Sequence, residues 1–526
     1  MRRNKDYSRV VAKNKRVKTR VQRLFLSRLF LTVLLVLIQI GVFSFFANIL
    51  NDYISVIFGL NIFLSLLFMI YLTNCKGKNE FKIAWLIPTI FFPILGISLY
   101  MITHMNWGGI SFKKRMKKVK TESVKFIPDN QISEKIINNN PDIASISKYL
   151  LNKGNFAPHT NNNVSYFRNG ESFFEDLLVE LEKAKEFIFI EFFIIDLDES
   201  WLKIMSILER KVKEGVEVRL LYDAIGSIIM SSRSYQNLLK EKGIKSHIFQ
   251  KLLPLYIVKL NNRDHRKIVV IDGKVSYTGG VNVTNKYFNQ KPHKFKYWKD
   301  TSIKILGPAI QNLTMLFLQN WNLETKEDDD YEKYIKRDYE LYNDKGVVIP
   351  YGDDAFNDED IAENVYLHIL NTATKYVHIM TPYVIIDNQM VESLCFAAAR
   401  GIDVTIICPP VPDHLISFCV GKIYQKILME AGVKIYIYQT GFIHAKQFIS
   451  DDKLLSIGSI NLDYRSFYHH FECNSIVYNN KTVNDAETDF QQTLSESILL
   501  TPELYKKIPK WQLVLGYIFR IVGPLM

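Results

Sequence analysis

One pattern of residues occurs twice in this chain and constrains its fold more than any other feature. Residues 265–282 and 444–461 both place Lys two positions after His, Asp seven after it, Gly followed by Gly or Ser at fourteen and fifteen, and Asn at seventeen. Residues two apart in a strand share a face, so each His and its Lys point to the same side. The repeat therefore predicts one site for a phosphodiester, built from both copies.

The chemistry-bearing residues of the two copies are His265, Lys267, Asp272 and Asn282, and His444, Lys446, Asp451 and Asn461. An imidazole, an ammonium and a carboxamide come from each copy, and an apolar run carries the chain into a core before Asp begins a turn. A lone His is usually a structural residue. A Lys beside an apolar strand is costly to bury, and its recurrence beside both histidines favours a functional site.

The likeness between the two halves extends beyond the motifs. Residues 184–196, 215–223 and 243–250 resemble residues 373–387, 401–409 and 432–439. A period of about 190 residues is too long for a solenoid and indicates a duplicated domain. Helices are expected over 202–214 and 391–400, each ending at a glycine. Strands rich in Ile and Val that alternate with helices favour mostly parallel sheets covered on both faces, so the fold class is α/β.

The spacing H-x-K-x4-D-x6-G-[GS]-x-N, present twice, resembles the phospholipase D superfamily. The resemblance implies a pseudo-twofold site with one half from each repeat, in which a histidine attacks phosphorus without a metal or another cofactor. The residues themselves also argue against metal, because an ammonium beside each His repels a cation and zinc needs three or four ligands at short spacing. The five cysteines form no CxxC pair, which indicates reduced thiols.

The net charge of +12 suits either nucleic acid or an anionic membrane. The N-terminal part favours the membrane, because residues 29–50, 53–75 and 83–103 are uncharged and mostly apolar. Each has about the 20 residues that a spanning helix needs, whereas a signal peptide has a shorter apolar region. We therefore expect a membrane protein with a large soluble body and no nucleic-acid partner.

The distribution of charge bears on topology. Residues 1–23 hold ten Lys or Arg against Asp6 alone, which places the N-terminus in the cytoplasm. The basic run at 113–120 favours a cytoplasmic catalytic body as well. Pro88 and Pro93 make the third hydrophobic segment a candidate for a re-entrant or interfacial helix, although Pro is also tolerated in spanning helices.

Over nearly its entire length the chain resembles bacterial cardiolipin synthases of the phospholipase D type, with residues 29–50 least clearly covered. The resemblance implies a multi-pass protein of the bacterial cell membrane that transfers a phosphatidyl group between two phosphatidylglycerols, giving cardiolipin and glycerol. By family pattern His265 attacks the donor phosphorus, and His444 protonates the departing glycerol and later deprotonates the acceptor. Nothing in the sequence identifies a protein partner.

The other motif residues have expected roles too. Lys267 and Lys446 would bind the non-bridging phosphoryl oxygens, and Asn282 and Asn461 would donate hydrogen bonds to the same region. Asp272 and Asp451 belong to the catalytic motifs, yet they lie beyond four strand residues and are expected mainly to fix the turn and the fold. Better candidates to orient the imidazoles are Asp300 and Glu472.

The expected domain division is a basic tail, a membrane region, a basic linker, two phospholipase D-like halves and an apolar tail, at residues 1–23, 24–104, 105–155, 156–345, 346–500 and 501–526. The apolar C-terminal tail would dock on the body or lie on the bilayer. An apolar insertion at 251–260 would reach the bilayer or add to the core.

Two alternative functions remain: a membrane-tethered phosphodiesterase that hydrolyses phospholipid or nucleic acid, and a disfavoured binding protein with a dead site. The acceptor also stays open between phosphatidylglycerol, phosphatidylethanolamine and another alcohol.

Overall fold

The computed structural model describes residues 41, 44, 54–104, 109–128, 130–250, 262–326, 331–335 and 338–525. The chain forms two compact units. The smaller unit holds residues 1–110, 252–258 and 525, and the larger holds residues 111–251, 259–524 and 526. The insertion at 251–260 lies outside the described residues.

The described part of the smaller unit is a set of packed helices, α2 (Ile54–Asn74), α3 (Asn79–Phe91) and α4 (Pro93–His104). Phe68, Leu72 and Tyr100 form its core. The helix expected over 53–75 corresponds to α2, but the segment at 83–103 divides between α3 and α4. Phe92 lies outside the helical region, at φ −139° and ψ 74°, because helical geometry is disfavoured for the residue before a proline.

Within the described residues, no helix is both long and apolar enough to cross a membrane. The first expected hydrophobic segment, residues 29–50, lies outside the described residues apart from Gly41 and Ser44.

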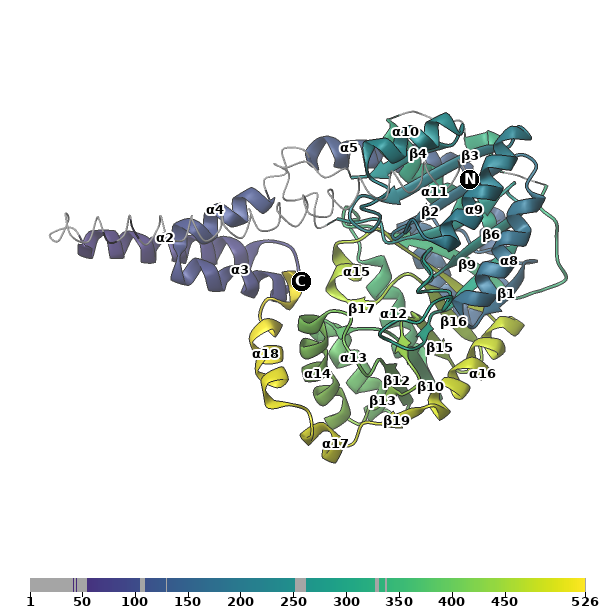
Figure 1. Ribbon diagram of the computed structural model, residues 1–526. Helices are drawn as coiled ribbons and strands as arrows, with labels where there is room; N and C mark the ends of the chain where they lie inside the picture. The colour runs from purple at the N-terminus through teal and green to yellow at the C-terminus, as the bar shows by residue number, and fades with distance from the viewer. Residues whose placement is uncertain are drawn as a thin grey trace. The chain divides into compact units, whose positions relative to one another are not determined.

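The larger unit contains two sheets whose strands follow the same order, as the duplicated sequence predicts (Figure 1). The first sheet has the order β1-β8-β6-β5-β2-β3-β4. Given in the same direction, the second has the order β9-β18-β16-β15-β10-β12-β13, followed by an additional edge strand, β19. The strands of the first are β1 (Asn163–Phe167), β2 (Phe187–Phe192), β3 (Glu217–Asp223), β4 (Lys245–Phe249), β5 (Lys267–Ile271), β6 (Val275–Gly279) and β8 (Ser302–Leu306). Those of the second are β9 (Val347–Asp353), β10 (Tyr376–Met380), β12 (Asp403–Cys408), β13 (Lys434–Tyr438), β15 (Gln447–Ser450), β16 (Leu454–Gly458), β18 (Glu472–Tyr478) and β19 (Ser497–Leu499).

The expectation of mostly parallel sheets is wrong, although the α/β class is confirmed. Only β2-β3 and β3-β4 are parallel in the first sheet, and only β10-β12 and β12-β13 in the second. The motif strand β5 returns through a tight turn at Asp272 and Gly273 into β6, and strands joined by so short a turn must run antiparallel. The second motif repeats this hairpin between β15 and β16.

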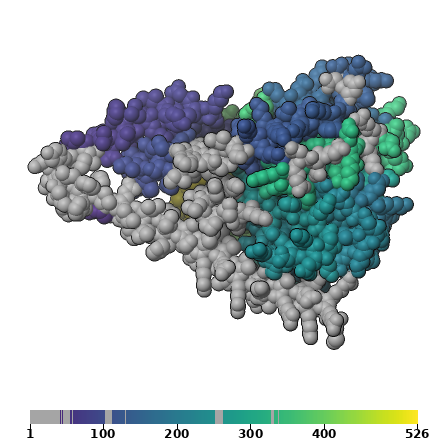
Figure 2. All heavy atoms as spheres, turned by 90° about the horizontal axis from the view of Figure 1, so that it is seen from above, coloured from purple at the N-terminus to yellow at the C-terminus, as the bar shows by residue number. Residues whose placement is uncertain are grey.

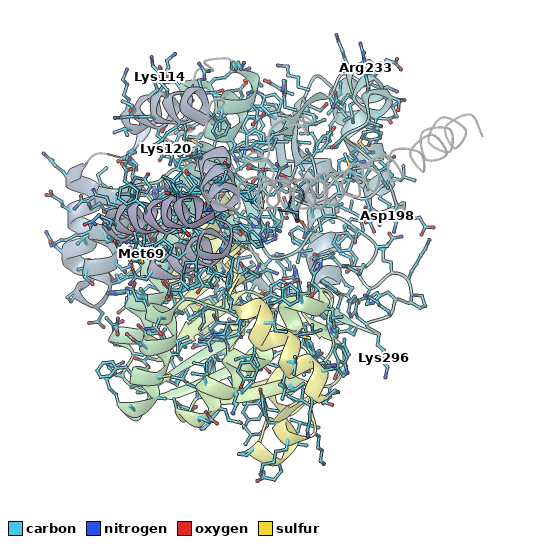
Figure 3. The ribbon with its side chains drawn as sticks, turned by 90° about the vertical axis from the view of Figure 1, so that its left-hand side faces the viewer. Met69, Lys114, Lys120, Asp198, Arg233 and Lys296 are labelled. Atoms are coloured by element: carbon cyan, nitrogen blue, oxygen red, sulfur yellow. The ribbon has the colours of Figure 1, made fainter. Side chains whose placement is uncertain are left out.

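Helices cover the sheets and also repeat between the halves. The first half contributes α8 (Gly170–Lys183), α9 (Glu199–Lys213), α10 (Arg233–Glu241) and α11 (Ile310–Thr325). The second contributes α12 (Ile361–Thr372), α13 (Asn388–Ala399), α14 (Leu415–Glu430), α15 (Tyr464–Tyr468) and α16 (Lys481–Ser495). Asp198, labelled in Figure 3, begins α9 by accepting hydrogen bonds from two main-chain N–H groups, which is the ordinary N-cap arrangement. Gly215 has φ +90° and follows α9, as expected.

The two halves interlock, which brings the motifs together. Strand β6 contacts β16 and β18, α11 packs on β4, β5 and β9, and α16 packs on β1 as well as on its own sheet. Short strands complete the junction: β7 (Trp298–Lys299) pairs with β14 (Phe442–Ile443), and β11 (Val384–Ile385) pairs with β17 (Leu462–Asp463). Figure 2 shows the teal atoms of the first half gathered in one block, with blue and green atoms beside them.

Residues 105–155, expected as a basic and then polar connection, are largely helical where described. They form α5 (Gly109–Ser123), α6 (Asn130–Asn139) and α7 (Ala144–Tyr149). Lys120, which Figure 3 labels on α5, forms an ion pair with Asp354 at 2.6 Å. The C-terminal part forms α17 (Pro502–Lys506) and α18 (Lys510–Arg520), and α18 packs against α14.

Candidate active site

Each motif histidine is held by main-chain pairing with the opposite half. The N–H of His265 donates to the carbonyl of Phe471 at 2.8 Å, and the N–H of His444 donates to the carbonyl of Lys299 at 2.7 Å. The carboxylate residues Glu472 and Asp300 follow directly in the chain. The pseudo-twofold relation therefore places each imidazole beside a carboxylate from the other half.

The pair formed by His265 and Glu472 is buried and well bonded. His265 Nδ1 lies 2.9 Å from Glu472 Oε1 and 3.0 Å from Oε2. The hydroxyls of Ser459 and Ser466 also donate to this carboxylate. Burial raises the pKa of Glu472, but the charge and hydrogen bond of His265 outweigh it and the pKa lies below its usual range. Burial lowers the pKa of His265 to about 3, so its imidazole is neutral.

The second pair is less fully bonded. His444 Nδ1 lies 2.5 Å from Asp300 Oδ2, and the N–H of Thr301 donates to the other oxygen at 2.9 Å. Gly280 occupies the position that Ser459 holds in the other half, and a Cβ there would lie 2.1 Å from Asp300 Oδ1. The absence of a side chain at Gly280 lets Asp300 approach the main chain closely, but no hydroxyl of the described residues donates a hydrogen bond to its carboxylate. Burial raises the pKa of Asp300 to about 7. At a pH near 7 the pair of Asp300 and His444 therefore carries a proton on its carboxylate, whereas Glu472 is ionised.

The two lysines lie inside the same site. Lys267 and Lys446 are 2% and 1% exposed, and each ammonium donates to the main-chain carbonyl of its own motif histidine. Burial lowers the pKa of Lys267 to about 8 and that of Lys446 to about 7. Both act electrostatically on Asp300. Within the part of the chain that the structure describes, neither ammonium forms an ion pair with a carboxylate, which indicates a site that is completed by an anion.

The two asparagines differ in their contacts. The amide of Asn282 donates to the Tyr287 hydroxyl at 2.9 Å, and its carbonyl accepts from the N–H of Ile194 at 3.1 Å. The side-chain oxygen of Asn461 is buried and has no hydrogen-bond partner among the described residues. Asn282 is therefore used within its own half, where it holds Tyr287, whose ring lies perpendicular to that of His444 with centroids 5.3 Å apart. Phosphoryl binding by either asparagine stays a prediction.

The motif aspartates lie at the far ends of their strands from the lysines. Asp272 accepts hydrogen bonds from the N–H groups of three consecutive residues, 185–187, each at 2.8 Å. Asp451 does the same for residues 374–376 at 2.7–3.0 Å. Both adopt positive φ, at 53° and 56°. Their carboxylates fasten each motif hairpin to the start of the neighbouring strand, β2 in the first half and β10 in the second. This agrees with the expected role in fixing the turn and the fold, and a catalytic role for either aspartate stays a prediction.

Two aromatic neighbours were not found from the sequence. Trp298 lies beside His444 with ring centroids 5.0 Å apart, and His470 lies beside His265 at 5.5 Å. Both residues stand two positions before the carboxylates, so aligning Asp300 with Glu472 would have paired them. The pseudo-twofold relation thus places an indole beside one catalytic histidine and an imidazole beside the other.

His470 also belongs to a group of metal-ligand residue types. Its Nδ1 lies 3.6 Å from Glu472 Oε1, and the ligand atoms of His265, His470 and Glu472 all lie within 4.8 Å of one another. Neither nitrogen of His470 has a hydrogen-bond partner among the described residues. The Glu472 carboxylate, however, already accepts hydrogen bonds from one imidazole and two hydroxyls. The positive charge of Lys267 would also repel a cation bound at this place.

Comparison with known proteins agrees with this geometry. The family model described as "Cardiolipin synthase, PLD-like domain" matches residues 177–318 and 366–494. A protein of Streptococcus mutans, described as uncharacterized, is 41% identical over 87% of this chain and 99% of its own length. A cardiolipin synthase of Listeria welshimeri is 32% identical over 84% of this chain and 93% of its own length. One of Staphylococcus aureus is 31% identical over 88% and 95%.

Among solved structures, a phosphatidylserine synthase of Haemophilus influenzae matches with a TM-score of 0.55. The match covers 73% of this chain and all of that chain at 14% identity, which supports the fold alone. The duplicated motif, the two interlocked sheets and the family match lead to one conclusion: the chain belongs to the cardiolipin synthase family with phospholipase D-like domains.

Proposed function

We propose that this protein transfers a phosphatidyl group from one phosphatidylglycerol to another, giving cardiolipin and glycerol. The observation that carries the proposal is the inequality of the two histidine–carboxylate pairs. Glu472 is ionised and accepts the Nδ1 proton of a neutral His265, which leaves a lone pair on Nε2 for attack. Asp300 has a pKa of about 7, so its pair with His444 suits proton exchange.

The first half-reaction follows from these charges. His265 Nε2 forms a bond to the donor phosphorus while the bond from phosphorus to the glycerol oxygen breaks. The pair of Asp300 and His444 delivers a proton to that oxygen, and Glu472 stabilises the positive charge that forms on the imidazole. Lys267 and Lys446 bind the non-bridging oxygens, whose negative charge meets preorganised donors.

The second half-reaction reverses the proton transfer. The hydroxyl of a second phosphatidylglycerol enters the place that glycerol left, gives its proton to the pair of Asp300 and His444, and attacks phosphorus. The bond to His265 Nε2 then breaks. The motif histidines and lysines are 7% exposed or less, which supports exclusion of water in favour of the alcohol.

The test of this function is reversal by glycerol. One phosphodiester replaces another, so the equilibrium should follow mass action. Purified protein given phosphatidylglycerol alone should form cardiolipin, as detected by mass spectrometry, and high glycerol should suppress that product. Cardiolipin plus glycerol should regenerate phosphatidylglycerol. Phosphatidic acid as the main product, with no reverse reaction, would instead favour the phosphodiesterase.

We also infer that the protein is attached to the bacterial membrane by several segments and that its catalytic body lies in the cytoplasm. Three hydrophobic segments and the basic N-terminus support this arrangement. The test uses a variant that lacks Cys75 and Cys395 and carries one new cysteine. Lys434→Cys should be shielded from an impermeant thiol reagent in intact cells, whereas Asn51→Cys should react. The opposite pattern would place the body outside.

A further inference from the structure

We propose that Lys286 binds the phosphodiester of the acceptor lipid and so distinguishes a second phosphatidylglycerol from glycerol or water. The inference rests on the proposed transfer reaction and deepens it. The acceptor in that reaction carries its own phosphate, separated from the attacking hydroxyl by a three-carbon glycerol unit. The site therefore needs a cation near His444 besides the two lysines that bind the reacting phosphate.

Lys286 has the required position. Its ammonium lies 3.7 Å from the ring centroid of Trp298, and the Trp298 ring lies 5.0 Å from that of His444. The ammonium and the histidine that exchanges the acceptor proton therefore both lie against the same indole ring. The ammonium also contributes to the low pKa of His444, after burial and Lys446. Lys286 and His444 thus share one electrostatic environment although they come from opposite halves.

The ammonium is held in place without being neutralised by direct contact. It lies over the aromatic rings of Trp298, Tyr287 and Phe295, at 3.7, 5.2 and 6.0 Å from their centroids. Within the described residues, no carboxylate lies within ion-pair distance of it. Burial lowers the pKa of Lys286, whereas Asp413 and Asp196 act on it from farther away and favour its charged form. Aromatic contacts position a cation while leaving its N–H groups able to bind an anion.

The repeat supplies a second argument. Lys286 stands four residues after Asn282, and Arg465 stands four residues after Asn461. Both motif copies thus carry a cation at the same place beyond the motif, partly buried in each case. On the second half, Asp413 and Tyr383 line a hollow together with Val411 and Phe418. Asp413 also acts electrostatically on Lys286, so the cation and this hollow on the second half share one carboxylate neighbour.

The test compares two reactions that share the donor and the covalent step. Exchange of labelled glycerol into phosphatidylglycerol uses a neutral acceptor, whereas cardiolipin formation uses an acceptor with a phosphate. Lys286→Gln should lower the ratio of cardiolipin formation to glycerol exchange about tenfold, because a hydrogen bond to a charged group is lost only in the first. Lys286→Arg should restore much of the ratio. Glycerolysis of cardiolipin, whose leaving group carries the same phosphate, should fall with cardiolipin formation.

The control is Lys296→Gln, which removes a charge from the same loop where the side chain points away from the body (Figure 3). Its ratio should equal that of the unaltered protein. An equal loss of both reactions in Lys286→Gln would show that Lys286 serves the reacting centre or the fold, and no loss in either would show that it binds nothing; both results overturn the inference. If the unaltered protein exchanges no glycerol, the proposed transfer function fails, and the inference fails with it.

Discussion

His265 Nδ1 lies 2.9 Å from Glu472 Oε1, and these two residues come from different halves of a duplicated chain. The carboxylate that prepares the nucleophile thus belongs to the half of the chain that does not contain the nucleophile. The reciprocal pair is formed by His444 of the second half and Asp300 of the first half. A single site assembled in this way depends on both halves for each of its chemical steps.

Glu472→Gln should reduce the rate of covalent-intermediate formation about 10³-fold. An amide can donate to Nδ1 and so favour the tautomer with a proton on Nε2, which then cannot attack phosphorus. The measurement is single-turnover release of labelled glycerol. The control is Glu487→Gln, because Glu487 bonds the His378 Nδ1 at 2.9 Å outside the site. Equal effects of the two substitutions would remove Glu472 from the mechanism.

His265→Ala and His444→Ala should each remove nearly all cardiolipin formation, and the double variant should be scarcely worse. The effects of substituting groups that act as one catalytic unit are strongly non-additive, so the second substitution should lower the rate little further. Steady-state rates of the three variants check this, with circular dichroism to establish folding. Substantial activity in either single variant would mean that the halves work separately.

The α/β class, the duplication and the four motif histidines and lysines could be predicted because they depend on local spacing. The direction of the strands could not, since Asp272 and Gly273 turn β5 straight back into β6. The sequence indicates Asp300 and Glu472 as the carboxylates beside the imidazoles, but which histidine each one contacts requires tertiary information. Asp300 and Glu472 stand at unequal distances from the histidines of their own halves, and only the interlocking of the halves pairs them crosswise.

The value of kcat/KM should fall as pH rises through about 7. The pKa of Asp300 is raised to about 7 and that of Lys446 is lowered to about 7. Above this pH the pair of Asp300 and His444 loses the proton that glycerol needs, and Lys446 loses the charge that binds phosphate. Both changes therefore lower kcat/KM as the pH rises. Rates at constant ionic strength on vesicles of fixed composition provide the measurement, and Asp300→Asn should remove part of the dependence. A rate that still rises above pH 8 would contradict the assignment.

Asp451→Ala should destabilise the protein by about 2–3 kcal/mol, because three main-chain N–H groups and one hydroxyl lose a charged acceptor. Burial raises the pKa of Asp451, but these hydrogen bonds outweigh it and hold the pKa below the usual value. The contribution is therefore present above the ordinary carboxyl pKa and is lost as pH falls through the lowered value. Urea denaturation at pH 7 and at lower pH measures this, with the exposed Asp485→Asn as control. Unchanged stability at pH 7 would contradict a structural role.

Chelation should leave turnover essentially intact. The positive charge at phosphorus comes from Lys267 and Lys446, and the oxygens of Glu472 already accept hydrogen bonds from His265, Ser459 and Ser466.

A cation bound by His265 would also occupy the nucleophile, so added Zn²⁺ should inhibit cardiolipin formation. His470→Asn should weaken that inhibition, because it removes the imidazole whose nitrogens lack hydrogen-bond partners among the described residues. The measurements are cardiolipin formation after dialysis against a chelator and metal content by mass spectrometry. If activity disappears on chelation, returns with one metal and depends on His470, the group of His265, His470 and Glu472 is a metal site and the lysine-based account is wrong.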